Sequence, residues 1–173
     1  MISVIAGKYK GRKLYNVETL HVRPTQAKVR KSVFQILEPF DGIKVLDLYA
    51  GVGTLGIEAM SRGATRVVFV EKNRRVFKVL KKNIELFEPD QCDLFLTDVL
   101  EFLTRLKNQY FDIIFADPPY NEVSFHSIKE KVESSLKPGG IFCMEMKKEP
   151  IDEPNIRVKH YGSTQMVFWR ATA

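Results

Sequence analysis

The chain contains little cysteine, little histidine and no long apolar run. Its 173 residues include two cysteines and three histidines. Cys92 and Cys143 lie far apart and have no Cys-x-x-Cys or histidine partner at metal-ligand spacing, which argues against a disulfide framework and a zinc site. No stretch approaches the roughly 18 apolar residues of a membrane helix, and the first residues lack the length and flanks of a signal peptide. We expect a cytoplasmic protein with reduced thiols, no metal and no membrane contact.

The sequence does contain enough apolar material for one folded domain. Hydrophobic residues make up 45% of the chain, and the length is typical of a domain with its own core. Residues 1–40 hold eight of the 27 basic residues and two of the 21 acidic ones, so they account for the whole net charge of +6. Such a basic segment fits either a polyanionic partner, because phosphates attract clustered Lys and Arg, or a solvated basic face.

From residue 43 onward, strand-like and helix-like segments alternate. Apolar runs predict strands over 44–48, 66–71, 92–97, 111–116 and 141–146, with helices over 54–62, 73–87, 99–108 and 124–136. Leu136-Lys137-Pro138-Gly139-Gly140 predicts a stop and a turn before the last of these strands. Two further runs, 158–161 and 165–170, predict an antiparallel hairpin at the sheet edge. This alternation is typical of a doubly wound α/β domain.

The first 40 residues form a separate unit in this pattern. Apolar runs at 2–6 and 12–17 flank Gly7-Lys8-Tyr9-Lys10-Gly11, which predicts a β-hairpin. Thr25 is the predicted N-cap of a helix that ends before Pro39. The apolar face of this helix consists of Val29, Val33, Ile36 and Leu37. We therefore expect residues 1–40 to be a basic hairpin and helix packed on a body formed by residues 41–173.

A glycine turn follows the first strand of the body. Gly51-x-Gly53-x-x-Gly56 matches the dinucleotide fingerprint, and Glu71 lies 20 residues after Gly51, which would fit an NAD-dependent oxidoreductase. S-adenosylmethionine is the alternative ligand. Asp47 ends the strand before the turn, where a carboxylate suits a sulfonium with its ammonium group and repels a pyrophosphate. Asp98 follows the third strand and could accept from an adenine amino group, whereas Glu71 can accept both ribose hydroxyls with either ligand.

Two of these acids also have a purely structural interpretation. Asp47 could be a charge at a helix N-terminus, and Asp98 could be an ordinary N-cap. One acid at each consecutive strand end nevertheless favours a ligand site, because open α/β sheets bind ligands at the carboxyl ends of their strands. The predicted cofactor-binding residues are Asp47, Tyr49, Ala50, Gly51, Gly53, Thr54, Glu71, Lys72, Asp98 and Val99.

The fourth strand of the body ends in Asp117-Pro118-Pro119-Tyr120. A carboxylate oxygen of Asp117 and the Pro118 carbonyl can accept hydrogen bonds from both N–H groups of an exocyclic amine, which directs the nitrogen lone pair at a methyl donor. The carboxylate also stabilises positive charge on that nitrogen, and stacking of a base on Tyr120 contributes about 1–3 kcal/mol. We expect all four residues to be catalytic, with Asp117 or water taking the proton. The alternative is an ordinary turn.

Together, residues 45–59, Glu71, Asp98 and 117–120 resemble the ordered motifs of class I amino-methyltransferases. Four further motifs resemble the RsmD family of bacterial 16S rRNA guanine-N2 methyltransferases: Gly7-x-Tyr9-Lys10-Gly11-Arg12-Lys13-Leu14, Arg23-Pro24-Thr25, Ser61-Arg62-Gly63-Ala64 and Tyr161-Gly162. The resemblance covers essentially the whole chain and departs mildly at Val52, where serine is commoner.

This resemblance implies a fold, a cofactor and a substrate. The fold would be Rossmann-like, with a mostly parallel seven-stranded sheet. The methyl donor would be S-adenosylmethionine, which leaves S-adenosylhomocysteine as the product. The acceptor would be the 2-amino group of a guanine in 16S rRNA, within a partly assembled small ribosomal subunit.

The basic segment then acquires a candidate partner. We predict that Lys8, Lys10, Arg12 and Lys13 contact rRNA phosphates, and that the target entrance is lined by Arg23, Thr25, Lys28 and Arg30. Arg30 lies beside the apolar stripe of its helix, so we expect its side chain to point toward the body. The chain is expected to be a monomer.

Three rival functions remain at this point. An adenine-N6 or glutamine-amide methyltransferase would more often begin the tetrapeptide with asparagine and would lack the N-terminal motifs. The others are an NAD-dependent oxidoreductase and a non-catalytic RNA-binding protein on the same scaffold.

Overall fold

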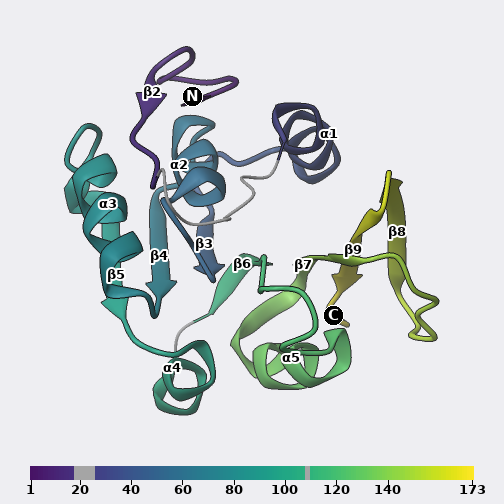
Figure 1. The fold of residues 1–173 in the computed structure, drawn as a ribbon. Helices are drawn as coiled ribbons and strands as arrows, with labels where there is room; N and C mark the ends of the chain where they lie inside the picture. The colour runs from purple at the N-terminus through teal and green to yellow at the C-terminus, as the bar shows by residue number, and fades with distance from the viewer. Residues whose placement is uncertain (18–25, 108–109) are drawn as a thin grey trace.

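The computed structural model describes residues 1–17, 26–107 and 110–173, and its centre is a seven-stranded sheet. The strand order is β5-β4-β3-β6-β7-β9-β8. The parallel strands are β3 (Lys44–Leu48), β4 (Arg66–Glu71), β5 (Cys92–Leu96), β6 (Phe111–Ala116) and β7 (Leu136–Lys147). β9 (Thr164–Arg170) runs antiparallel between β7 and the edge strand β8 (Ile156–Tyr161). The predicted parallel sheet with an antiparallel C-terminal hairpin is therefore confirmed (Figure 1).

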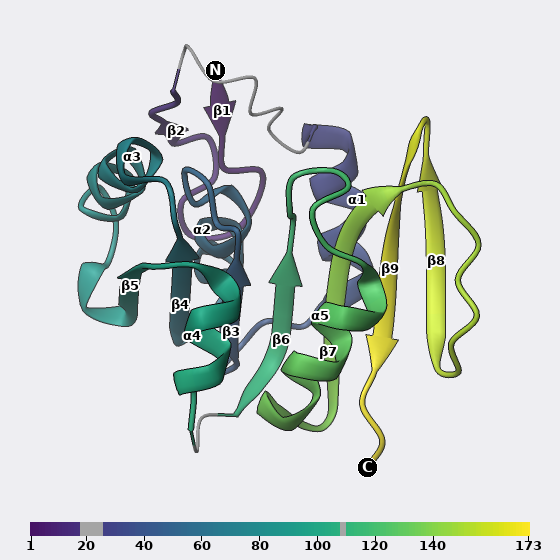
Figure 2. The same cartoon turned by 60° about the horizontal axis from the view of Figure 1, so that its bottom comes forward.

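Helices cover both faces of this sheet, as Figure 2 shows from a second direction. One core contains residues of α1 (Ala27–Leu37), α2 (Thr54–Ser61) and α3 (Arg74–Ile84), and the other contains residues of α4 (Val99–Arg105) and α5 (Phe125–Val132). Strand side chains alternate between the two cores, since successive residues of a strand point to opposite faces. The central strands are therefore buried on both sides, which explains their continuous apolar runs. Among the helices of the described residues, none is long and apolar enough to cross a membrane.

Several boundaries differ from the sequence prediction. The predicted stop and turn before residue 141 is wrong, because β7 begins at Leu136, which pairs with Phe111. The register then shifts before the next pair, Ile113 with Ile141. Gly139 and Gly140 therefore lie in an irregular part of β7. The first two strands are also shorter than expected, with β1 at Ile2–Ser3 and β2 at Lys13–Leu14. The predicted N-cap Thr25 lies outside the described residues, and α1 follows Gln26.

The N-terminal hairpin is short because its loop binds to α2 instead of extending the pair. The buried Glu58 accepts hydrogen bonds from the backbone nitrogens of Ile5 and Ala6, at 2.9 and 3.0 Å. Ser61 Oγ accepts one from the Tyr9 nitrogen at 2.9 Å. A Cβ at Gly7 would lie 1.9 Å from the Ser61 carbonyl oxygen, so only glycine fits there. Two motifs that the sequence shows far apart, around residues 7–14 and 61–64, thus form one interface.

A buried asparagine fixes the end of the same segment. Asn83 of α3 donates to the carbonyl oxygens of Tyr15 and Val52, at 3.0 and 2.9 Å, and accepts from the Tyr15 nitrogen at 2.8 Å. Removing such a buried partner leaves several backbone groups unsatisfied, at a cost of about 1–3 kcal/mol each. The hairpin is therefore part of the folded body, and its side chains Val4, Tyr9 and Leu14 belong to the first core.

Candidate active site

A large cavity opens at the carboxyl ends of the central strands. Its volume is about 1190 Å³, above the roughly 300–1,000 Å³ of common single-ligand pockets. β3 and β6, the neighbouring strands from which the chain winds in opposite directions, both end at this cavity. Ligands of open α/β sheets bind at such a switch point. The cavity has room for a cofactor and part of a second molecule.

The turn after β3 brings the backbone close to the cavity. Tyr49, Gly51 and Gly53 have positive φ angles of 57°, 58° and 95°. No atom would lie within 4 Å of a Cβ at Gly51, whereas one at Gly53 would lie 2.7 Å from Leu80 Cδ1. Gly51 therefore exposes its backbone, while Gly53 allows α2 and α3 to pack closely. Tyr49, Ala50, Gly51 and Thr54 line the cavity as expected for a ligand-binding turn, but Gly53 does not.

Asp47 and Glu71 hold this turn with their carboxylate oxygens. Asp47 Oδ2 accepts from the Gly56 nitrogen at 2.9 Å, and Glu71 accepts from the nitrogens of Gly51 and Asn73 at 2.9 and 2.8 Å. Both side chains also line the cavity. Asp47 can therefore both stabilise the start of α2 and contact a ligand.

The electrostatics of Asp47 mark this part of the cavity as acidic. Asp47 is 1% exposed, and burial raises the pKa of its carboxyl group well above the usual value. The hydrogen bond from Gly56 opposes this rise, and the neighbouring carboxylates of Asp117 and Glu71 add to it. A cationic group placed here would lower that pKa, because opposite charge favours the ionised carboxylate.

Asp98 caps α4. Its Oδ1 accepts from the nitrogens of Leu100 and Glu101 at 2.9 and 3.3 Å, as an N-cap does. Asp98 is exposed and does not line the cavity, whereas the next residue, Val99, does. Contact of Asp98 with an adenine stays a prediction.

Lys72 and Tyr49 also line the cavity. Lys72 forms an ion pair of 3.5 Å with Glu122, and both side chains are half exposed. Burial raises the pKa of Tyr49 to about 12, and the charges of Asp98 and Glu122 contribute. The phenol therefore keeps its proton at neutral pH and can donate a hydrogen bond.

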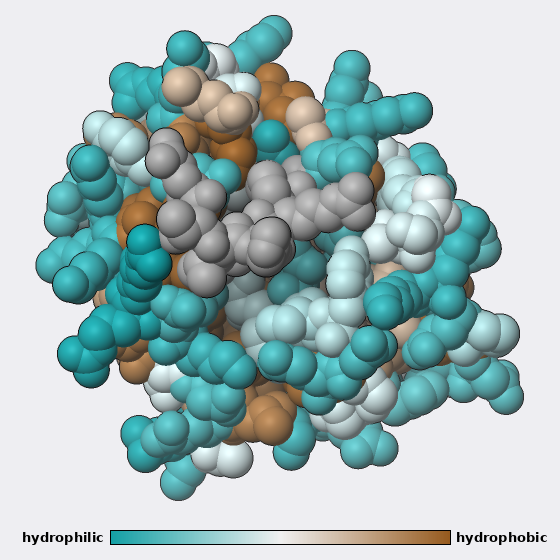
Figure 3. All heavy atoms as spheres, in the orientation of Figure 1, coloured by the Kyte–Doolittle hydropathy of each residue, from teal (hydrophilic) through white to brown (hydrophobic). Residues whose placement is uncertain are grey.

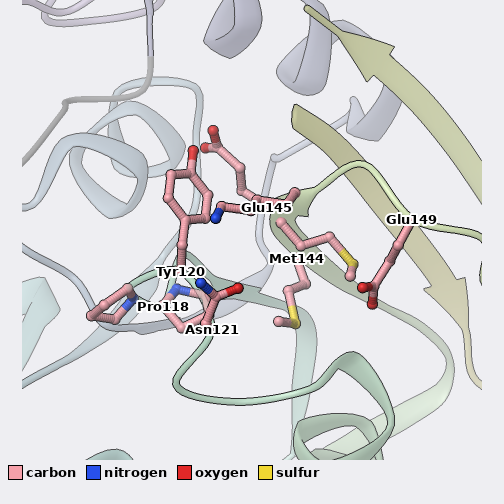
Figure 4. Close-up of a pocket in the computed structure, with 9 residues that line it drawn as sticks. Pro118, Tyr120, Asn121, Met144, Glu145 and Glu149 are labelled. Atoms are coloured by element: carbon pink, nitrogen blue, oxygen red, sulfur yellow. The ribbon is translucent and has the colours of Figure 1, made fainter. Parts of the chain in front are cut away.

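Asp117-Pro118-Pro119-Tyr120 forms another part of the cavity wall, and all four residues line it. Asp117 directly follows β6 and is close enough to raise the pKa of Asp47. Tyr120 is 41% exposed, and Lys147 Nζ lies 5.7 Å from the centre of its ring. Pro118 and Tyr120 also border a small side pocket with Asn121, Met144 and Glu149 (Figure 4). All the predicted cofactor residues except Gly53 and Asp98 thus share one cavity with the four predicted target residues.

Glu145 is a lining residue that the sequence prediction missed. It lies in β7 directly after Met144, which pairs with Ala116 at the end of β6, so Asp117 and Glu145 take neighbouring positions on two parallel strands. Figure 4 shows the side chains of Glu145 and Tyr120 pointing to the same side. The only signal for it in the sequence is an acidic residue inside the apolar run Ile141–Met146.

The C-terminal hairpin closes the cavity against α1, another contact that was not predicted. Ser32 of α1 accepts hydrogen bonds from Lys159 Nζ at 2.8 Å and binds the Tyr161 hydroxyl at 2.7 Å. Lys159, Tyr161 and Gly162 all line the cavity. This gives the Tyr161-Gly162 motif a position beside the site.

The predicted RNA-binding residues fall into different environments. Arg23 and Thr25 lie outside the described residues. Lys10, Lys13 and Lys28 are exposed, and Lys28 also lines the cavity. These three lysines remain available to a partner.

Three other predicted RNA-binding residues, Lys8, Arg12 and Arg30, make contacts within the protein. Lys8 pairs with Glu88, and Arg12 donates to the Leu86 carbonyl at 3.1 Å while its guanidinium lies 5.3 Å from the Tyr9 ring centre. Arg30 points toward the body, as expected, but it is only 3% exposed and does not line the cavity. It donates to the Ser3 carbonyl at 3.1 Å, and burial lowers the pKa of its guanidinium. Its position does not fit an RNA contact.

A second basic surface lies on α3. It was not predicted from the sequence, because basic and acidic residues balance over residues 41–173 as a whole. The helix has no acidic residue and five exposed basic ones: Arg74, Arg75, Lys78, Lys81 and Lys82. Within the described residues none of the five forms a salt bridge. Lys82 Nζ lies 3.8 Å from the centre of the exposed Tyr15 ring, which joins this surface to the hairpin.

The chain is similar to several known proteins. The family model described as conserved hypothetical protein 95 matches residues 2–170. A ribosomal RNA small subunit methyltransferase D from Haemophilus influenzae is 34% identical over 154 residues, which cover 86% of this chain and 80% of the relative. A putative rRNA methyltransferase from Bacillus subtilis is 34% identical over 152 residues, covering 84% and 83%.

The solved structure of a putative methyltransferase from Escherichia coli superposes with a TM-score of 0.88 at 29% identity, over 99% of this chain and 98% of that one. The Rossmann-like methyltransferase fold is thereby confirmed. Because the family model spans nearly all of the sequence, the chain belongs to this family, the RsmD family that its N-terminal motifs resemble.

Proposed function

We propose that this protein transfers a methyl group from S-adenosylmethionine to the exocyclic 2-amino group of a guanine in small-subunit rRNA. One observation carries the proposal: an acidic glycine turn and Asp117-Pro118-Pro119-Tyr120 line the same cavity. The name of the Haemophilus influenzae relative, a small-subunit rRNA methyltransferase, supports the same substrate class.

The glycine turn fits S-adenosylmethionine better than NAD. A pyrophosphate needs free backbone N–H groups at the helix start. Here the Gly51 nitrogen donates to Glu71 and the Gly56 nitrogen to Asp47. These carboxylates would repel a pyrophosphate but attract a sulfonium with its ammonium group. We assign Glu71 to the ribose hydroxyls, and Val99 and Asp98 to the adenine.

The tetrapeptide supplies the target chemistry. S-adenosylmethionine supplies an electrophilic methyl group when bound. Asp117 and the Pro118 carbonyl accept hydrogen bonds from the two N–H groups of the target amine and orient its lone pair. Tyr120 stacks on the base. The nitrogen gives up one proton to Asp117 or to water as it becomes methylated, and the Asp117 carboxylate stabilises its transient positive charge.

The basic surface of α3, extended by Lys10 and Lys13, fits the rRNA backbone. α3 starts beside the cavity, since Lys72 and Asn73 line it, and its other end lies against Tyr15. An 11-residue helix is about 16 Å long, which is long enough to contact more than one phosphate of a strand. Hydrophilic side chains cover most of the face shown in Figure 3. Lys8 and Arg12 also stay in this proposal, because both are exposed although they contact Glu88 and the Leu86 carbonyl. The buried Arg30 is not assigned to RNA.

Transfer of labelled methyl groups tests this function. Labelled S-adenosylmethionine is supplied with undermethylated small subunits, free rRNA, DNA or protein, and the modified group is mapped. We expect label on a guanine 2-amino group of the small-subunit rRNA, in partly assembled subunits more than in free rRNA. Label on adenine N6 or a glutamine amide would support the rival methyltransferases.

Ligand-dependent melting separates the remaining rivals, since a ligand raises the melting temperature only of a state that it binds. We expect stabilisation by S-adenosylhomocysteine and none by NAD. The reverse result would favour an oxidoreductase, and cofactor binding without turnover on any substrate would favour a non-catalytic RNA-binding protein.

A further inference from the structure

We infer that Glu145 selects guanine as the target base by accepting a hydrogen bond from its N1–H. This inference rests on the proposed function and names a specificity residue of the same site. It starts from the position of Glu145 in the cavity, beside the tetrapeptide and away from the glycine turn.

The register of the sheet places Glu145 next to Asp117. Ala116 and Met144 are paired across β6 and β7, and the two acids are the next residues on these parallel strands. Neighbouring strands lie about 4.8 Å apart, so both carboxyl groups project from adjacent points of the cavity wall. Met144 and Met146 pack into the second core, and alternation along the strand directs Glu145 to the opposite face.

The lining of the two pockets assigns Glu145 to the target side. Glu145 borders the main cavity and also the small side pocket formed with Pro118, Pro119 and Tyr120. No residue of the glycine turn, all of which the structure describes, lines that side pocket. In Figure 4 the Glu145 carboxylate lies on the same side as the phenol end of Tyr120, on which the base would stack.

Guanine has two neighbouring hydrogen-bond donors, which match the two acidic acceptors of this site. The N1–H and the 2-amino group are neighbouring donors on one edge of the base. With the 2-amino group held by Asp117 and the Pro118 carbonyl, the N1–H lies beside them and needs an acceptor. A carboxylate accepts only, so Glu145 attracts guanine and repels adenine or cytosine, which present a lone pair at the corresponding ring nitrogen. A site built around such a donor discriminates strongly against bases that lack it.

A base analogue isolates this contact. 2-Aminopurine keeps the 2-amino group but lacks O6 and has a lone pair at N1 where guanine has N1–H, so the part of the preference that depends on Glu145 reports the N1–H contact. We compare kcat/KM for small subunits that carry guanine or 2-aminopurine at the mapped target position. Wild-type protein should prefer guanine by about 10- to 100-fold, the usual effect of a hydrogen bond to a charged group. In Glu145→Ala guanine turnover should fall by a similar factor, and the preference should nearly disappear.

Two further variants keep the test interpretable. Glu145→Gln preserves the shape of the side chain, and its amide can accept from N1–H or donate to a bare N1, so its preference should also fall toward one. Glu149→Ala removes an acid that borders the side pocket but not the main cavity, and it should keep the wild-type preference. Stabilisation by S-adenosylhomocysteine should be unchanged in all three variants.

The outcomes separate this inference from the function on which it rests. A wild-type preference that persists in both Glu145 variants would overturn the inference, and so would a wild-type protein that treats the two bases alike. Failure of the proposed function would appear earlier, as wild-type protein that methylates no guanine in the mapping experiment.

Discussion

The proposed function divides the cavity into a cofactor half, at the ends of β3 and β4, and a target half, after β6 and near the end of β7, and both halves are acidic. In the cofactor half, Asp47 and Glu71 accept hydrogen bonds from backbone nitrogens of the turn and the helix starts that they hold. In the target half, Asp117 and Glu145 lie beside Pro118 and Tyr120, at neighbouring positions of two strands. The first pair shapes a binding surface from the backbone, whereas we propose that the second pair faces the group to be methylated. Substitutions in the two halves should therefore impair different steps.

Asp117→Ala should have the largest effect. It removes an acceptor for the amine and the charge that stabilises it, so kcat should fall by about 10³-fold. Stabilisation by S-adenosylhomocysteine should remain, because the glycine turn is untouched. Asp117→Asn keeps one acceptor oxygen and should recover part of the rate. Loss of cofactor binding in Asp117→Ala would show that the two halves are not separable.

Glu71→Gln should impair the cofactor half. One carboxylate oxygen becomes an amide donor, so it can no longer serve both the backbone nitrogens and a ribose hydroxyl. Affinity for S-adenosylhomocysteine, measured by calorimetry, should fall by about 10- to 100-fold. Glu85→Gln, at the exposed end of α3, is the matched control and should bind normally. An unchanged affinity in Glu71→Gln would remove Glu71 from the cofactor site.

Charge reversal on α3 should weaken RNA binding and leave cofactor binding unchanged. The double variant Lys78→Glu with Lys81→Glu should bind small subunits about tenfold more weakly, with a shallower dependence on salt, since each lost phosphate contact lowers the slope by about one. Affinity for S-adenosylhomocysteine should not change. Lys107→Glu with Lys131→Glu, at exposed positions after α4 and within α5, is the control. Equal losses in both double variants would indicate a general charge effect.

Asp47→Asn should have a small, pH-dependent effect on the stability of the ligand-free protein. Burial raises the pKa of Asp47 in the folded protein, so the folded state binds its proton more tightly than the unfolded state does. This proton contributes its full stabilisation of the folded state below the unfolded pKa of about 3.9. The contribution is lost as the pH rises through the folded pKa. Asparagine does not titrate but can still accept from the Gly56 nitrogen.

Thermal melts of the wild type and Asp47→Asn without ligand check this dependence. Relative to the variant, wild-type protein should lose stability progressively as the pH rises above about 3.9, until the pH exceeds the raised folded pKa of Asp47. A difference in melting temperature that stays constant with pH would contradict a raised pKa for Asp47.

Much of the fold could be predicted from the sequence, because the central strands are apolar on both faces. The ranges 44–48, 66–71 and 111–116 match β3, β4 and β6 at both ends. The errors occurred where distant residues decide local structure. Gly139 and Gly140 favour a turn locally, but pairing between Phe111 and Leu136 keeps their segment in the sheet. The hairpin loop binds Glu58 and Ser61, more than 50 residues away, in place of its own partner strand.

The site was predictable to the extent that its residues follow strand ends. Asp47, Glu71 and Asp117 could be expected at one edge of the sheet, because the carboxyl ends of parallel strands meet there. Glu145 could not, since a single acid within an apolar run gives no indication of what it faces. The proposed RNA surface was harder still to locate. Counting charges indicated only the N-terminal segment, where Arg30 is buried, and overlooked the basic face of α3, whose excess charge is balanced by acids elsewhere.

The most direct measurement of the central claim is nucleoside analysis of small-subunit rRNA after reaction with labelled S-adenosylmethionine and either wild-type protein or Asp117→Ala. The account predicts labelled N2-methylguanosine with wild-type protein and almost none with the variant, although both are stabilised by S-adenosylhomocysteine. Label in another nucleoside, or equal labelling by the two proteins, would contradict it.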